Sequence, residues 1–248
     1  MRRFLGVALA TAFLASPALA DEQEAKAVLD KAIKAAGGEE VLGKATVVTW
    51  KTKGTLTING NEGQISGQST VQGLDRHRAE FEGDFGGNAI KGVTVLNGDK
   101  GWRKFGENTM ELDADALASE KRNVYLQVAS ALLVPLKGKG FKLDSAADEK
   151  VGDKPAAVVK VTGPDGKDFT LSFDKETGLP VKMVAKLRGF QGDEVTQETL
   201  WSDYKTFAGI KKATKVETKR DGAPFIQSEV TEFKVLDKAP AEAFAEPN

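Results

Sequence analysis

The chain has 248 residues, of which 35 are lysine or arginine and 36 are aspartate or glutamate, so its formal net charge at pH 7 is −1. This balance argues against nucleic-acid binding, and the absence of cysteine excludes both a disulfide framework and a lipid-anchor cysteine. A content of 40% hydrophobic and 29% charged residues is typical of a globular protein rather than a disordered one.

The first residues of the chain predict an export signal. The basic start MRR is followed by the apolar stretch FLGVALATAFLA and by small residues at Ala18 and Ala20. The apolar stretch is shorter than the roughly 20 residues that a transmembrane helix needs, so an integral membrane protein is not expected. We expect residues 1–20 to be a signal peptide cleaved after Ala20. The mature chain, residues 21–248, should be soluble in the periplasm or another extracytoplasmic compartment.

Two segments have the periodicity of amphipathic helices. The first covers residues 22–36 and is followed by Gly37 and Gly38, which are typical of a helix C-cap. The second follows Asp113, a candidate N-cap, and Pro135 stops it. The apolar positions of the first helix are Ala25, Val28, Leu29, Ala32, Ile33 and Ala36, and those of the second are Leu117, Val124, Val128, Ala131 and Leu132.

The rest of the chain alternates with the period of two that is typical of strands. Val48 and Trp50 share one face of the first strand, whereas Thr49 and Lys51 share the other. Short turn sequences such as NGNEG, FGGN and NGDKG favour antiparallel hairpins. The strands that follow the first one are predicted at 64–72, 79–85, 90–96, from Trp102 onward, and at 141–144, 156–162, 168–174, 180–188, 194–204, 210–219 and 224–235.

These elements predict a mainly β protein with helices, of the α+β class. We expect one domain of about ten or eleven antiparallel strands, because no Ser-, Pro- or Gly-rich linker divides the chain. A sheet of that length curls rather than staying flat, and the two helices would lie in its hollow.

Little in the sequence points to catalysis. His77 is the only histidine, and a hydrogen-bonded or strand-surface role is favoured over a role as general base. The acidic residues Glu111, Asp113 and Asp115 are explained by the start of the second helix. The sequence therefore predicts a protein that is not an enzyme, with no catalytic residue, no cofactor and no metal site.

Two further motifs leave a choice between a plain and a functional interpretation. The glycine-rich stretch FEGDFGGNAIKG opens a strand, so a hairpin is favoured over a phosphate-binding loop, which opens a helix. Lys211, Lys215 and Lys219 share one side of a predicted strand. A solvated face is the simpler interpretation of these lysines, and docking to anionic lipid or to an acidic partner is the alternative.

The three tryptophans, Trp50, Trp102 and Trp201, are expected to be buried from solvent. Burying a side chain of about 150–250 Å² at about 25 cal/mol per Å² contributes roughly 4–6 kcal/mol as an upper figure. Most such residues fill a core. In a curled sheet, an incompletely filled concave face would instead leave an apolar cavity suited to acyl chains.

The order of elements resembles the LolA/LolB-like outer-membrane lipoprotein carriers. The resemblance is carried by the first helix, by LNGDKGW, by FTLSFDKETGLPVKMV, by ETLWSDYKTFAGIKKATKV and by the closing AFAEP. It implies a curved antiparallel half-barrel over residues 21–248 whose helices cap a hydrophobic cavity. It further implies a non-enzymatic, monomeric carrier of lipid or of the acyl chains of lipoproteins, with a membrane-associated donor or acceptor protein as partner.

In such a half-barrel, Trp102 would face the concave side, and Phe105 the other side unless a bulge brings both inward. The residues expected to line the cavity are Trp50, Leu56, Phe81, Phe85, Trp102, Val128, Leu132, Phe169 and Leu171. Two alternatives remain open at this point: a structural or protein-interaction domain with a filled core, and a hydrolase with a polar cluster around His77.

Overall fold

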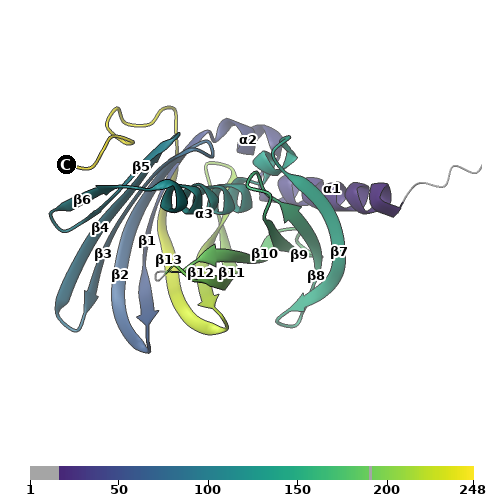
Figure 1. Ribbon diagram of the computed structural model, residues 1–248. Helices are drawn as coiled ribbons and strands as arrows, with labels where there is room; N and C mark the ends of the chain where they lie inside the picture. Colours follow the sequence, from purple (N-terminus) through teal and green to yellow (C-terminus); the bar gives the residue numbers. More distant parts are fainter. Residues whose placement is uncertain (1–16, 190–191) are drawn as a thin grey trace, which may run out of the picture.

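The computed structural model describes residues 17–189 and 192–248. The thirteen strands in these ranges form one antiparallel sheet. The sheet curves strongly but is not closed, because β6 and β7 form its two edges (Figure 1). Across the sheet the order is β6-β5-β4-β3-β2-β1-β13-β12-β11-β10-β9-β8-β7. The strands are β1 (Val47–Ile58), β2 (Asn61–Gln72), β3 (Arg76–Phe85), β4 (Asn88–Asn97), β5 (Lys100–Phe105), β6 (Asn108–Glu111), β7 (Lys142–Val151), β8 (Lys154–Thr162), β9 (Asp168–Asp174), β10 (Pro180–Arg188), β11 (Glu194–Phe207), β12 (Ile210–Arg220) and β13 (Ala223–Leu236).

Tight turns explain why strands that are consecutive in the chain pair with one another. In the first hairpin only Asn59 and Gly60 separate the two strands, and both residues have positive φ, 51° and 79°. An Asn-Gly pair adopts this conformation readily, and its twist matches that of the flanking strands. The exception to consecutive pairing is the ladder between β1 and β13, which joins the two halves of the sheet.

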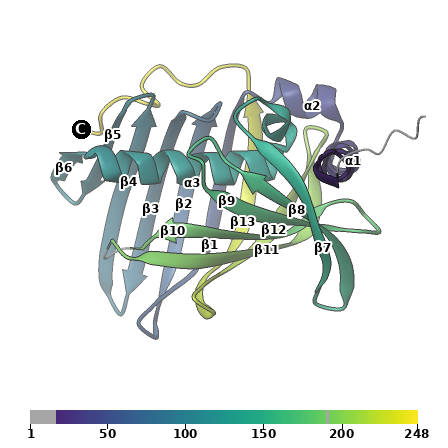
Figure 2. The same ribbon diagram turned by 45° about the vertical axis from the view of Figure 1, so that its right-hand side comes forward.

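Helix α3 (Ala114–Leu132) crosses the concave face of the sheet (Figure 2). The Asp113 side chain accepts a hydrogen bond from the backbone N–H of Ala116 at 2.8 Å, as the sequence predicts. The helix ends before Leu133, whose φ is 61°, and a short 3-10 helix, η1 (Val134–Lys137), follows. Helix α3 is the element that lies across the hollow.

Helix α1 (Pro17–Ala36) packs mainly against β7 and β8, at one edge of the sheet. The backbone N–H of Gly38 donates to the carbonyl of Ile33 at 2.9 Å, which confirms the predicted glycine C-cap. Gly37 has φ of 140° and lies against the carbonyl of Gly209, where a Cβ would come within 2.4 Å. The buried residues of this helix are Ala25, Leu29, Ala32, Ile33 and Ala36, which belong to the predicted stripe.

The sequence interpretation differs from the structure in the number and extent of the elements. Among the described residues there are thirteen strands rather than ten or eleven, and of their helices only α3 spans the hollow. The four residues of β6 are too few to show alternation, and the second half of β7 is polar. Helix α2 (Glu39–Lys44) has only six residues, which is too short for a helical period to show.

The predicted signal peptide lies largely outside the described residues, since 1–16 are not among them. Helix α1 begins at Pro17 and so runs across the predicted cleavage position after Ala20. Within the described ranges, no helix combines the length and the apolar character needed to span a membrane.

Candidate functional site: a cavity beneath helix α3

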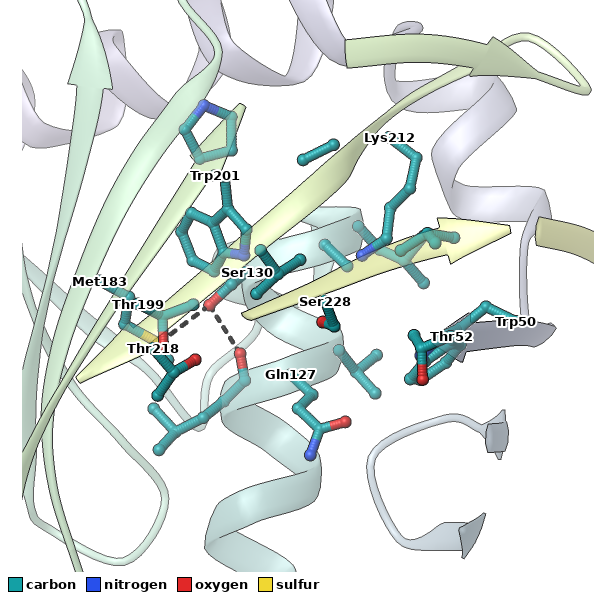
Figure 3. A pocket seen from close by; sticks show the side chains of 18 of the residues that line it. Trp50, Thr52, Gln127, Ser130, Met183, Thr199, Trp201, Lys212, Thr218 and Ser228 are labelled. Carbon is teal, nitrogen blue, oxygen red and sulfur yellow. Dashed lines mark hydrogen bonds between the residues drawn. The ribbon is translucent and has the colours of Figure 1, made fainter. Parts of the chain in front are cut away.

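A cavity of about 350 Å³ lies between helix α3 and the concave face of β1 and β10–β13 (Figure 3). This volume is at the lower end of the roughly 300–1,000 Å³ that ligand pockets occupy. Its walls are largely apolar, with Trp50 from β1, Trp201 from β11, Phe233 from β13 and Leu126 from α3. Such walls suit a slender hydrocarbon chain.

A few polar side chains interrupt these walls. Thr52 and Ser228 face the cavity from the sheet, and Gln127 faces it from α3 (Figure 3). The hydroxyl of Ser130 donates to the carbonyl of Leu126 at 2.6 Å and lies 3.3 Å from the sulfur of Met183. A small number of polar groups in an apolar pocket is the usual arrangement for orienting one end of a ligand.

The charged residues that line the cavity are all cationic: Lys211, Lys212 and Arg220. The ammonium of Lys212 lies 5.8 Å from the centre of the Trp50 ring, and burial lowers the pKa of this lysine to about 8. The guanidinium of Arg220 lies 3.7 Å from the ring centre of Phe225. The cavity therefore has a positive charge within apolar walls.

One anchor of α3 is a buried pair between His77 on β3 and Glu120. Nδ1 of His77 lies 3.1 Å from Oε1 of Glu120, and the two residues are 3% and 6% exposed. Burial raises the pKa of the Glu120 carboxyl, but the hydrogen bond with His77 and the charges of His77 and Arg103 outweigh it, so this pKa lies below its ordinary value. Neither His77 nor Glu120 lines the cavity.

A second anchor ties α3 to the opposite side of the hollow. The guanidinium of Arg122 donates to the carbonyls of Lys186 and Asp168, at 2.9 and 3.0 Å, and to the carboxylate of Asp165 at 3.0 Å. The hydroxyl of Tyr125 donates to the same carboxylate at 2.7 Å. Burial is the main cause that raises the pKa of this tyrosine, and the hydrogen bond to Asp165 is the second. The two anchors fix α3 as the roof of the cavity.

Three of the residues predicted to line a cavity do so: Trp50, Val128 and Leu132. Phe169 and Leu171 lie in the filled part of the core, where the ring of Phe169 is 6.2 Å from that of Tyr125. They are among the buried residues of β9 and do not line this cavity.

Three more of the predicted lining residues, Leu56, Phe81 and Phe85, lie on the same face of the sheet beyond the cavity. There the inner face of β2–β4 is rich in glycine, and a Cβ at Gly92 or Gly63 would come within 2.5 Å of the ring of Phe81 or Phe85. We call this surface the glycine shelf; its residues are Leu56, Gly63, Ile65, Gly67, Phe81, Gly83, Phe85, Ile90, Gly92 and Phe105.

The register of β4 and β5 contradicts the expected orientation of Trp102. Leu96, in the main core, pairs with Gly101, so Trp102 and its partner Val95 point to the convex face. There they pack with Phe244 of the C-terminal tail. Phe105 is the residue on the concave side, and it is 47% exposed. No bulge interrupts this ladder, so strict alternation separates the two rings.

Lys212 and Arg220 are the charged site residues that sequence reasoning missed. The lysines singled out there lie at odd-numbered positions of the same strand, and one of them, Lys211, is exposed but also lines the cavity. Ile210 is fully buried at the start of β12, and Lys212 is two residues farther along. Alternation from that isoleucine is the signal that would have placed the lysine inward.

No protein-family model matches the sequence, and a search of curated proteins finds no match. Solved structures do match. A LolA superfamily protein from Nitrosomonas europaea is 12% identical with a TM-score of 0.58, covering 89% of this chain and 97% of that one. A DUF1329 family protein from Desulfovibrio piger is 11% identical with a TM-score of 0.58, covering 89% and 96%.

A third match is a domain assigned to the outer-membrane lipoprotein-sorting proteins, from Vibrio parahaemolyticus. It is 11% identical with a TM-score of 0.55, covering 88% of this chain and 97% of that one. At this level of identity the similarities establish the fold, and the chain has a LolA-like fold.

Proposed function

We propose that this protein is an extracytoplasmic carrier or binding protein that holds an acyl chain of a lipid or of a lipidated protein beneath α3, without a chemical step. The observation that supports this most is the cavity of about 350 Å³ with tryptophan and phenylalanine in its walls. The fold it shares with a lipoprotein-sorting domain is in keeping with the same role. In this proposal the protein acts as a monomer that exchanges cargo with a membrane-associated donor or acceptor protein.

The direct test is to identify what the protein carries. The chain lacking residues 1–20 is purified without detergent and extracted with organic solvent, and the extract is analysed by mass spectrometry. A phospholipid, fatty acid or lipopeptide bound near stoichiometrically is the expected result. An extract with no amphiphile, both before and after exposure of the protein to membrane lipids, would favour the structural or protein-interaction domain instead.

A second test places the ligand in the cavity. Titration with an uncharged fluorescent fatty probe compares Trp50→Ala, which alters a cavity wall, with Trp102→Ala, which alters the convex face under the C-terminal tail. Removal of the Trp50 ring should weaken binding about tenfold, since a lost aromatic contact costs roughly 1–2 kcal/mol. The Trp102 variant should bind the probe as the wild type does. Equal weakening in the two variants would argue against this cavity as the binding site.

A further inference from the structure

One of the cationic side chains in the cavity, Lys212, has no carboxylate beside it among the residues that the structure describes. Among its lining residues are three cationic side chains and neither aspartate nor glutamate. Within the described ranges, 17–189 and 192–248, no carboxylate comes within 4.0 Å of the Lys212 ammonium. By contrast, Lys215, farther along the same strand, pairs with Asp203 at 2.6 Å.

The position of Lys212 is unfavourable for a side chain with a purely structural role. Moving an ammonium away from water costs free energy unless a counter-charge or hydrogen bonds replace the lost hydration. The contact with the Trp50 ring at 5.8 Å offsets part of this cost. A methionine of similar length would fill the same space without a charge, so the ammonium has no role in packing that an apolar side chain could not take.

We propose that Lys212 binds the anionic headgroup of the amphiphile held in the cavity, a carboxylate or a phosphate, while the hydrocarbon chain lies against the apolar walls. This inference rests on the proposed function and narrows its ligand class to acidic single-chain amphiphiles. The hydroxyls of Thr52 and Ser228 line the same space as the ammonium and are suited to share the headgroup oxygens (Figure 3).

The protonation of Lys212 fits this role. Burial holds its pKa at about 8, so the side chain is mostly charged at neutral pH. A bound anion favours the charged form and raises this pKa. Binding of an anion should therefore weaken as the pH rises above about 8, because the free protein loses the proton that the complex needs.

The experiment compares three ligands with the same hydrocarbon chain: dodecanoate, dodecyl phosphate and uncharged monododecanoylglycerol. Each is titrated below its micelle concentration, by calorimetry, into the wild type, into Lys212→Met and into Lys205→Met. Lys205 is the matched control because it lies opposite Lys212 in the β11–β12 ladder but is exposed and does not line the cavity.

We expect the wild type to bind at least one of the two anions about tenfold more tightly than the glyceride, which is the gain expected of a charge-assisted hydrogen bond. The tighter of the two identifies carboxylate or phosphate as the natural headgroup. Lys212→Met should lose this preference while still binding the glyceride, and Lys205→Met should keep it. Dodecanoate affinity should fall between pH 7 and about pH 9 in the wild type but stay level in Lys212→Met.

Two other results would have different meanings. Equal binding of all three ligands by the wild type and by Lys212→Met would overturn the role of Lys212 and leave the proposed function standing. Failure of the wild type to bind any of the three would count against the proposed function itself. Retained binding of the glyceride by Lys212→Met shows in the same titration that the variant is folded.

Discussion

Under α3 the concave face of the sheet presents large side chains such as Trp50 and Trp201, whereas on the glycine shelf it presents Gly63, Gly67, Gly83 and Gly92. The shelf needs no helix above it, because the rings of Phe81 and Phe85 lie against Gly92 and Gly63 and cover the backbone there themselves. Under the helix, bulky residues on both surfaces keep α3 away from the sheet and leave room between them. The comparison teaches that the cavity depends on what covers the sheet as much as on the sheet.

The two regions meet at one edge. Thr52, which lines the cavity, pairs with Gly67 of the shelf, and Phe81 pairs with the same glycine on its other side. An acyl chain longer than the cavity could therefore continue onto the shelf, where Ile90 is 38% and Phe105 47% exposed. The structure of the covered region depends on the anchors of α3, whereas that of the shelf depends on close approach of backbone and rings at glycines. Substitutions at the anchors and at the glycines therefore test the two regions separately.

The largest effect is expected when the Arg122 anchor is removed. Arg122→Met would remove the guanidinium that donates to two carbonyls and neutralises the Asp165 carboxylate, which should lower the free energy of unfolding by about 3–5 kcal/mol. Urea unfolding at pH 7 measures this change. Arg188→Met is the control, because that side chain is exposed and lies 3.7 Å from Asp115, so its loss should change stability by less than about 1 kcal/mol. Similar small effects of both substitutions would mean that Arg122 does not anchor the roof.

The next effect concerns close approach in the sheet. A Cβ at Gly54 would come within 2.0 Å of the Gln227 carbonyl, a backbone atom, whereas one at Gly92 would meet the movable ring of Phe81. Gly54→Ala should therefore lower the free energy of unfolding by about 2–3 kcal/mol, and Gly92→Ala by less than about 1 kcal/mol. Urea unfolding of the two variants at one pH tests this order. A larger cost for Gly92→Ala would mean that the shelf, not the β1–β13 junction, is the tighter part of the sheet.

A smaller effect, dependent on pH, is expected at the Glu120 anchor. Its pKa is lowered in the folded protein, so the carboxylate stabilises the fold above its ordinary pKa of 4.5, and this contribution is lost as the pH falls through the folded pKa. Glu120→Gln should cost about 1–2 kcal/mol at pH 7 and less in acid. Thermal unfolding of wild type and variant between neutral pH and about pH 3 measures the difference. Glu107→Gln, in an exposed turn, is the control, and a difference that does not shrink in acid would contradict the shift.

Much of the fold could be predicted because local rules decide it. The Asn59-Gly60 turn, the Asp113 cap and the Gly38 cap each depend on conformations or hydrogen bonds that nearby residues specify. The number of strands and the position of α1 were harder to predict, because both are decided at the edges of the sheet. A four-residue edge strand has no periodicity to detect, and the partner of an apolar helix stripe is chosen by tertiary packing.

The site was predicted less completely, because alternation gives two faces without saying which one is concave. Trp102 and Phe105 were correctly separated but assigned to the wrong faces, since the tail containing Phe244 covers the convex side. The exposed lysines of β12 were visible in the sequence, whereas Lys212 needed the strand's inner face to be fixed first. That face is set by packing against Trp50, which comes from a strand more than 150 residues earlier in the chain.

The smallest effect has the opposite sign and concerns Lys212. Burial lowers its pKa from 10.5 to about 8, so an uncharged side chain should fit the empty cavity better, and Lys212→Met should raise the free energy of unfolding by about 1 kcal/mol at pH 7. Between pH 8 and 10.5 the unfolded wild type binds more protons than the folded protein, so its stability rises relative to the variant and the difference closes. Urea unfolding across this range tests the trend, with Lys205→Met expected to show none.

If Lys212→Met instead destabilises the protein at pH 7, a group within the fold already compensates the ammonium, and the lysine is structural. If it stabilises the empty protein but weakens binding of dodecanoate, the same charge costs stability without ligand and stabilises the complex. That combination is expected of a residue kept for ligand recognition. A charge that lowers the stability of the protein without ligand has no advantage unless it strengthens binding. The same combination would also locate this cost in the region under α3, where the sheet is covered and a ligand can be enclosed, and not on the shelf.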